Sequence, residues 1–169
     1  MPATAQRIRL ALWQRSKTRA RQRYGFDIEA GDALDRARAL VAGDPGNAEL
    51  HLLLASVLAT RGEPALAESE ARQALDLAPR RARARTTLAT LLVQRGEKDE
   101  GLREARNAAA LDMEDPTILF NLGLAEWVNG ERKTARAAFS RAAEILDKEN
   151  RPAGADERPR WWRRIRRRG

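Results

Sequence analysis

Few side chains in this 169-residue chain are of the types that catalyse reactions or bind metals. The chain has no cysteine, and His51 is its only histidine. Because His51 stands among Leu50, Leu52 and Leu53, we interpret it as a packed or half-buried side chain rather than a catalytic base or a zinc ligand. The sequence contains no phosphate-binding glycine loop and no metal-ligand spacing. The residue types therefore predict neither an enzyme nor a metal site, and we expect no cofactor.

Basic side chains at the two ends of the chain are the other candidates for chemistry. Residues 1–24 carry seven basic groups and no acid, and residues 151–169 carry eight arginines and two acids. The whole chain has a net charge of +8, which leaves a net charge of −5 on residues 25–150. This uneven distribution predicts that any contact with a polyanion is made by the ends of the chain.

Between these ends, residues 47–150 repeat one pattern three times at a spacing of 34 residues. Gly62, Gly96 and Gly130 mark the units, and a glutamate follows each of them. Within each unit, apolar residues recur three and four positions apart, as on one face of a helix. A fixed period of this length indicates a repeat architecture, in which neighbouring helix hairpins bury one another's apolar faces. Matching columns include Leu54, Leu88 and Leu122, then Ala67, Gly101 and Ala135, then Ala74, Ala108 and Ala142.

The repeat pattern also predicts helix boundaries and a division of the chain into three parts. We expect helices over residues 47–61, 64–78, 81–95, 98–112, 116–129 and 132–149. Residues 25–46 look like a partial repeat, which we expect to form a degenerate first hairpin with a helix over residues 4–24. The three parts are a basic N-terminal region (1–46), the repeat domain (47–150) and a basic tail (151–169).

The pattern resembles that of the tetratricopeptide repeat family. The 34-residue length agrees, and so do the large-then-small pairs Leu54-Ala55 and Leu88-Ala89, the turn glycine, and the small residue early in the second helix. The resemblance implies an all-α fold, an α-solenoid of antiparallel helix hairpins with three such repeats. It also implies a function in protein–protein interaction.

In the family that the chain resembles, the first helices of successive units line a concave groove that holds a peptide or a helix of a partner. Carried over to this chain, the groove residues are Leu52, Ser56, Thr60, Thr86, Thr90, Phe120, Asn121, Leu124 and Trp127. Part of the family grips a terminal carboxylate with cations in the groove. The corresponding positions here are Leu52, Ser56, Thr87, Thr117 and Asn121. Because none is a cation, we expect an apolar segment rather than an acidic one, with Phe120 and Trp127 as its anchors.

The N-terminal helix has three open interpretations. It is a solvated or edge-packing helix, a contact for nucleic acid or another acidic surface, or a contact for an anionic membrane. Ile8, Ala11 and Leu12 cluster on one side of it, which makes a poor amphipathic membrane helix. Its candidate contact residues are Arg15, Lys17, Arg19, Arg21 and Arg23. A second arginine cluster, residues 80–85, lies at the expected start of a helix, where the dipole disfavours cations, and we interpret it as surface charge.

The C-terminal tail has two interpretations. In one, Trp161, Trp162 and Ile165 pack as a cap on the last repeat. In the other, arginines contact phosphates or an acidic protein surface, while the tryptophans stack on bases or lie at a membrane interface. The residues that would make these contacts are Trp161, Trp162, Arg163, Arg164, Arg166, Arg167 and Arg168.

Together, these patterns favour a protein-binding adaptor or an assembly subunit. The alternatives are a nucleic-acid- or ribonucleoprotein-associated factor and a peripheral protein of anionic membranes. Self-association is a further option, because the basic tail of one copy could meet the acidic repeat region of another. No apolar run approaches the length of a membrane span, and the stretch from Ile8 to Trp13 is too short for a signal sequence. We therefore expect a cytoplasmic protein.

Overall fold

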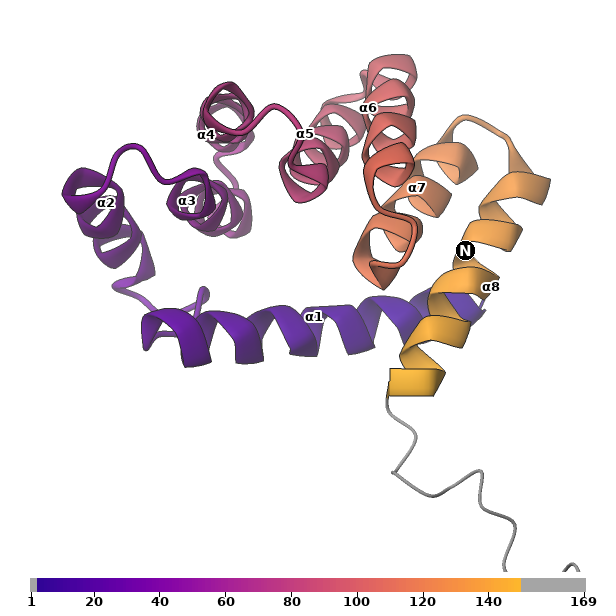
Figure 1. Ribbon diagram of the computed structural model, residues 1–169, viewed down its shortest axis with the longest axis horizontal. Helices are drawn as coiled ribbons and strands as arrows, with labels where there is room; N and C mark the ends of the chain where they lie inside the picture. The colour runs from indigo at the N-terminus through magenta and orange to yellow at the C-terminus, as the bar shows by residue number, and fades with distance from the viewer. Residues whose placement is uncertain (1–2, 150–169) are drawn as a thin grey trace, which may run out of the picture.

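The computed structural model describes residues 3–149, and the C-terminal tail predicted above lies outside them. The described residues form eight helices and no strand. Figure 1 shows α2 to α8 arranged in a curved row, with α1 lying across the inner side of the curve. The helices are α1 (Ala3–Tyr24), α2 (Ala33–Gly43), α3 (Ala48–Thr60), α4 (Pro64–Leu77), α5 (Ala82–Arg95), α6 (Lys98–Leu111), α7 (Pro116–Val128) and α8 (Arg132–Glu149).

The three repeats are the helix pairs α3/α4, α5/α6 and α7/α8, which make the most extensive helix contacts of the structure. The six helices begin and end within about two residues of the predicted positions. Helix α2 packs on α3, so the row continues before the first repeat. The prediction of an all-α solenoid built from helix hairpins is confirmed.

The marker glycines set the turn inside each hairpin. Gly62, Gly96 and Gly130 have φ angles of 75°, 91° and 85°, a left-handed conformation that glycine adopts without steric cost. In each turn, the glutamate after the glycine donates its backbone N–H to the carbonyl five residues earlier, at 2.9–3.0 Å. This pattern satisfies a carbonyl that the helix end would otherwise leave unpaired. The repeated glycine is therefore a helix stop that aims the second helix back along the first.

Small residues let the paired helices approach closely. At Gly101, an added Cβ would lie 2.6 Å from Val93 Cγ2, and at Gly123 it would lie 2.7 Å from Phe139 Cε1. Both distances are far below ordinary van der Waals contact. The column of Ala74, Ala108 and Ala142 is also fully buried. These positions need a small side chain because a second helix backbone or ring occupies the adjacent space.

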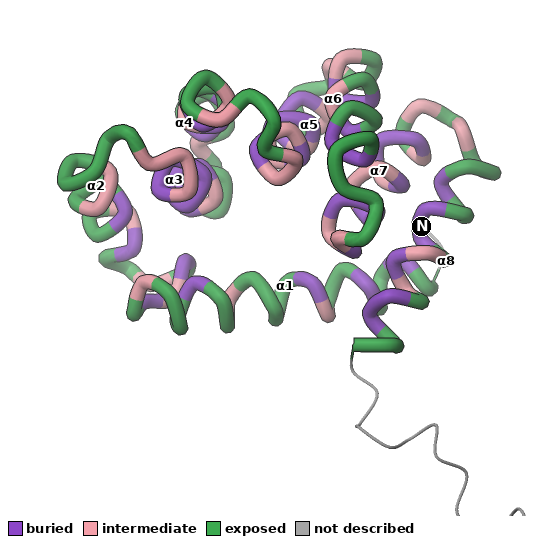
Figure 2. Tube along the Cα trace, in the orientation of Figure 1, coloured by how far each residue is buried: buried purple, intermediate pink, exposed green. Residues whose placement is uncertain are grey.

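Burial is concentrated on the faces where helices meet, and the outer surfaces are exposed (Figure 2). The last apolar residue of the repeat pattern is buried in only one of the three units. Leu77 and Leu111, at the ends of α4 and α6, are exposed, whereas Ile145 in the longer α8 is buried. His51 is buried, as predicted. Its Nε2 donates to the Pro45 carbonyl at 3.0 Å and its Nδ1 lies 2.7 Å from the Glu70 carboxylate, so it joins the loop before α3 to α4.

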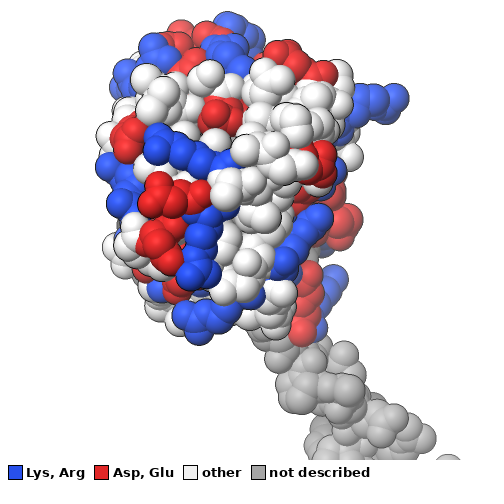
Figure 3. All heavy atoms as spheres, turned by 90° about the vertical axis from the view of Figure 1, so that its left-hand side faces the viewer, with Lys and Arg blue, Asp and Glu red and all other residues white. Residues whose placement is uncertain are grey.

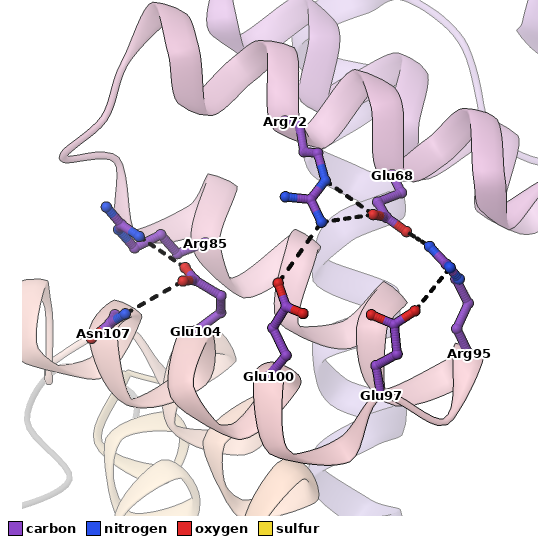
Figure 4. A network of polar contacts seen from close by, with 8 residues as sticks. All are labelled: Glu68, Arg72, Arg85, Arg95, Glu97, Glu100, Glu104 and Asn107. Carbon is purple, nitrogen blue, oxygen red and sulfur yellow. Dashed lines mark hydrogen bonds and ion pairs between the residues drawn. The ribbon is translucent and has the colours of Figure 1, made fainter.

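Ion pairs connect the outer surfaces of neighbouring helices (Figure 4). Glu68 of α4 is paired with Arg72 of the same helix and with Arg95 of α5, and Arg95 also lies 2.8 Å from Glu97. Burial alone raises the pKa of Glu68, but the hydrogen bonds from Arg72 and Arg95 outweigh it and hold that pKa below its usual value. At the α2 end of the row, acidic and basic side chains likewise interleave, without a large patch of one sign (Figure 3).

Helix α1 departs from the expected arrangement. It does not form a packed hairpin with α2, and its extensive helix contacts are with α7 and α8 at the opposite end of the row. The reason lies in its apolar residues. Ala5, Ile8 and Leu12 are three and four positions apart in the first half of α1 and are buried against the last repeat, whereas α2 satisfies its own apolar face, Ala33 and Ala37, in the first-repeat core.

Replacing Ala108 with leucine should destabilise the protein by about 1–3 kcal/mol, because the fully buried position has no space for three more carbons. Urea unfolding followed by circular dichroism would measure the change. The matched control is Ala110→Leu on the same helix, at an exposed position, which should unfold with the wild type. Equal midpoints for the two variants would contradict the packing described for this column.

Candidate functional site

Helix α1 and the concave face of the repeats form the walls of a half-open cavity of about 340 Å³. This volume is near the lower end of the roughly 300–1,000 Å³ typical of ligand pockets. The inner helices α3, α5 and α7 form one wall, and the second half of α1 forms the other. Residues from all four helices line it, including Leu52, Ser56, Thr87, Asn121, Arg19 and Arg23.

The repeat wall of the cavity is rich in uncharged polar groups. The hydroxyls of Ser56, Thr86, Thr87 and Thr90 each donate to the backbone carbonyl four residues earlier in their own helix, at 2.8–3.0 Å. Asn121 donates in the same way, at 2.8 Å. Because these bonds use the hydroxyl protons, lone pairs of Ser56 and Thr87 remain available to accept hydrogen bonds. Thr90 Oγ1 and Asn121 Oδ1 contact each other at 3.2 Å. The wall therefore suits a ligand that carries N–H donors beside apolar surface.

One edge of the cavity is basic. Glu49 of α3 lies 3.3 Å from Arg23 of α1 and 4.0 Å from Arg83 of α5, and it also pairs with Arg81. Burial lowers the pKa of Arg83, and the nearby charge of Arg19 lowers it further. Burial also raises the pKa of Tyr24, which lines the same edge. One glutamate thus faces an excess of arginines in a partly desolvated place.

The aromatic end of the predicted groove is covered by α1. Ile8 and Leu12 pack in one apolar cluster with Leu119, Phe120 and Phe139, and the rings of Phe120 and Phe139 are 5.6 Å apart between centroids. Phe120 is only 5% exposed. In this structure, the chain's own N-terminal helix therefore occupies the place that we expected a partner segment to fill.

The basic residues of α1 pair largely with acids of the same chain. The closest pairs join Arg7 to Asp147 (3.6 Å), Arg15 to Glu149, Lys17 to Glu29 (2.9 Å), Arg21 to Asp27 (3.1 Å) and Arg23 to Glu49 (3.3 Å). Exposed pairs of this kind contribute little individually, about 0–1 kcal/mol each. Asp147, Glu149 and Glu49 belong to the repeats, whereas Asp27 and Glu29 follow α1 directly, so much of the charge that predicted a polyanion contact is paired within the chain. Arg19, in contrast, lines the cavity.

The predicted groove residues thus divide into three sets. Those that line the cavity are Leu52, Ser56, Thr86, Thr90 and Asn121. Those that pack in the cluster beneath the first half of α1 are Phe120, Leu124 and Trp127. Trp127 also has the Arg132 guanidinium 3.9 Å from its ring centroid. Thr60 is exposed and outside the cavity, and its hydroxyl donates to the Val57 carbonyl.

Sequence reasoning missed the cavity residues that do not belong to the repeat pattern. Glu49 and Arg83 lie in the first turns of α3 and α5, and Tyr24 ends α1. The arginine cluster at residues 80–85 was the one available signal, and its interpretation as surface charge did not predict that Arg83 lines the cavity. The packing of α3 beside α5 brings Glu49 to Arg83, and the position of α1 adds Tyr24 to them.

The described range, residues 3–149, also bears on the other function classes. No helix in this range is both long and apolar enough to cross a membrane. The same range contains no cluster of three or more histidine, aspartate or glutamate side chains arranged to hold a metal ion.

Comparison with known families gave one assignment. The family model described as Tetratricopeptide repeat matches residues 29–82 and 86–154, which together are more than half of the chain. Both matched ranges exclude α1, and within residues 3–149 they fall on the segment that contains α2 to α8. A search of curated proteins found no match.

Solved structures with the same fold include two proteins. A crystal structure of MamA has a TM-score of 0.58 and 19% identity, covering 88% of this chain and 97% of MamA. A crystal structure of YrrB, described as "a TPR protein with an unusual peptide-binding site", has a TM-score of 0.55 and 22% identity, covering 66% of this chain and 58% of YrrB. At these identities, the similarity establishes the fold.

Ile8 should be a main anchor of α1, because it is 2% exposed in the apolar cluster on the last repeat. We expect Ile8→Ala to weaken this docking by about 2–5 kcal/mol. Hydrogen exchange measured by mass spectrometry should then be faster in α1 than in the wild type, with α3 to α6 unchanged. Leu10→Ala, at a position 56% exposed on the same helix, is the matched control. Equal exchange in the two variants would contradict docking through Ile8.

Proposed function

Because this chain belongs to the tetratricopeptide repeat family, a family of protein-interaction modules, we propose that it is an adaptor that holds an extended segment of a partner protein between α1 and the concave face. The observation that carries the proposal is the cavity of about 340 Å³ with a wall of hydrogen-bond acceptors. An extended chain has a free N–H on alternate residues along each edge. Such donors match the lone pairs of Ser56 and Thr87.

The dimensions of the cavity favour an extended segment over a helix. A helix with its side chains is about 10–12 Å wide, and α1 already takes the place of a helix across the concave side (Figure 1). A second helix would need α1 to leave, and with it the apolar contacts of Ile8 and Leu12. A chain in extended conformation needs only the space that remains beside α1.

Two residues of the predicted groove take a different role in this proposal. Phe120 and Trp127 pack in the α1 cluster, so we assign them to the docking of α1 and give the partner contacts to Ser56, Thr90 and Asn121. YrrB, which shares the fold, is described as having an unusual peptide-binding site. By analogy, a repeat protein of this fold can bind a peptide by a variation of the common groove, and here the variation would be the covering helix.

Polyanion binding by the C-terminal tail is a second candidate function, carried by five arginines within residues 163–168. Arginine keeps its charge near neutral pH, so five in six positions repel one another unless water or an anionic surface compensates. The anionic surface could be nucleic acid, a membrane, or the acidic repeat region of another copy. The ion pairs of α1 with its own chain leave the tail as the main candidate for such a contact.

Thr87→Trp should block partner binding by at least about tenfold, because the indole would fill much of the cavity and remove an anchor position. The absence of native cysteine allows the partner to be identified first, by a photo-crosslinker on a single cysteine introduced at Ser56. Capture of the identified partner by each variant would then be measured by biolayer interferometry. Ser69→Trp, on the exposed face of α4, should bind as the wild type does. Retained binding by Thr87→Trp with native helicity would place the partner elsewhere.

Replacing Arg163, Arg164, Arg166, Arg167 and Arg168 with glutamine should weaken RNA or anionic-vesicle binding and flatten its dependence on salt, because fewer counterions are released. Thermal unfolding should not change. Fluorescence anisotropy across a salt series would measure both the affinity and its salt dependence. The contrasting variant is Trp161→Ala with Trp162→Ala. If only this tryptophan variant loses binding, and it also unfolds at a lower temperature than the wild type, the tail is a hydrophobic cap and its arginines are solvated.

A further inference from the structure

The basic edge of the cavity has a chemistry that the repeat pattern alone does not supply. The groove positions carried by the repeats contain no cation, and for that reason the sequence predicted a preference for an uncharged segment. In the structure, α1 brings Arg19 and Arg23 over the groove, and the first turn of α5 adds Arg83. The covering helix thus converts an uncharged groove into one with a cationic edge.

The charges at this edge are not balanced within the described part of the chain. Glu49 is the acid closest to Arg83, at 4.0 Å, and it is shared with Arg23 and Arg81. Arg19 has no ion pair among residues 3–149. Its charge lowers the pKa of Arg83, which lines the same cavity. The charges of Glu49 and Asp115 raise the pKa of Arg83. Arg83, which is partly desolvated, and the exposed Arg19 of another helix therefore line the same cavity, and, in the part of the chain that the structure describes, the one carboxylate within 4.0 Å of either is shared with Arg23 and Arg81.

We propose that this edge binds a carboxylate of the partner segment, that of an aspartate or glutamate side chain, between Arg19 and Arg83. The inference rests on the proposed function, because it names the chemistry of the segment that the cavity holds. Guanidinium groups bind carboxylates through short, charge-assisted hydrogen bonds, often two at once. A carboxylate there would relieve the repulsion between the two arginines, and the hydroxyl wall would take the adjoining backbone.

A peptide segment fits this arrangement better than an amphiphile such as a fatty acid. The leucines beside the cavity are largely buried by their neighbours, since Leu52, Leu53 and Leu91 are each less than 9% exposed. Most of the exposed lining of the cavity is apolar, but the half-buried side chains of Ser56, Thr87, Thr90 and Asn121 place polar groups within it. Such groups match the amides of a peptide, whereas an alkyl chain would leave their lone pairs unsatisfied.

The test is a selection of random peptides displayed on phage against the full chain, followed by sequencing of the bound pool. The compared proteins are the wild type, Arg19→Gln with Arg83→Gln, and a control with the same loss of charge, Arg103→Gln with Arg136→Gln. The control arginines are exposed on α6 and α8 and do not line the cavity. Thr87→Trp reports in parallel on the cavity itself.

We expect acidic residues to be enriched among peptides selected on the wild type and on the control pair, and not on Arg19→Gln with Arg83→Gln. A synthetic peptide from the wild-type pool should bind that variant about ten- to hundredfold more weakly, as for the loss of charged hydrogen bonds. Arg19→Lys with Arg83→Lys keeps the charges and should keep the acidic enrichment. If the glutamine pair does not fold, the single variant Arg19→Gln, on an exposed position, decides the question by the same comparison.

Equal acidic content on the wild type and on the glutamine variant overturns the inference and leaves the proposed function in place, provided that Thr87→Trp selects no peptide above background. If Thr87→Trp selects the same peptides as the wild type, the cavity is not the binding site. In that case the proposed function fails, and the inference fails with it.

Discussion

A helix hairpin of this size cannot bury its own apolar face, and the rest of the structure depends on how that face is covered. In the middle of the row, neighbouring hairpins cover one another, and they approach closely because Gly101, Gly123 and the alanine column leave room for a second helix. At an end of the row, there is no next hairpin. Each end therefore needs a different partner, and the two ends of this chain find different ones.

The two ends are covered by segments from outside the three repeats. Helix α2 covers the first repeat as half a hairpin, through Ala33 and Ala37. The last repeat is partly covered by the first half of α1, although α1 is more than a hundred residues away in sequence. Helix α1 joins α2 at the far end of the row and reaches the last repeat across the concave side (Figure 1). The cavity is thus a consequence of how the last apolar face is buried.

The parts of the fold with a local cause could be predicted from the sequence. The turn glycines and the spacing of apolar residues determine each hairpin, and they indicated helix boundaries close to those observed. The position of α1 has no local cause. Ala5, Ile8 and Leu12 show which face of α1 is apolar, but any exposed apolar surface would satisfy that face equally well. The site inherits the same limit, since Ser56, Thr90 and Asn121 follow from repeat positions, whereas Arg19 and Arg83 meet only because α1 lies where it does.

The contacts of α1 depend on which charged side chains lie close together rather than on the net charge of each segment. Taken as a sum, the N-terminal helix is the basic partner of an acidic repeat region, and several of its cations pair with acids of that region. Exposed pairs contribute little to stability, so the apolar contacts of Ile8 and Leu12 must provide most of the docking energy. In the observed orientation of α1, its cations pair with Asp147 and Glu149 of α8 and with Glu49 of α3. With that orientation, α1 places Arg19 opposite Arg83, and the polarity of the cavity follows from the same choice that forms it.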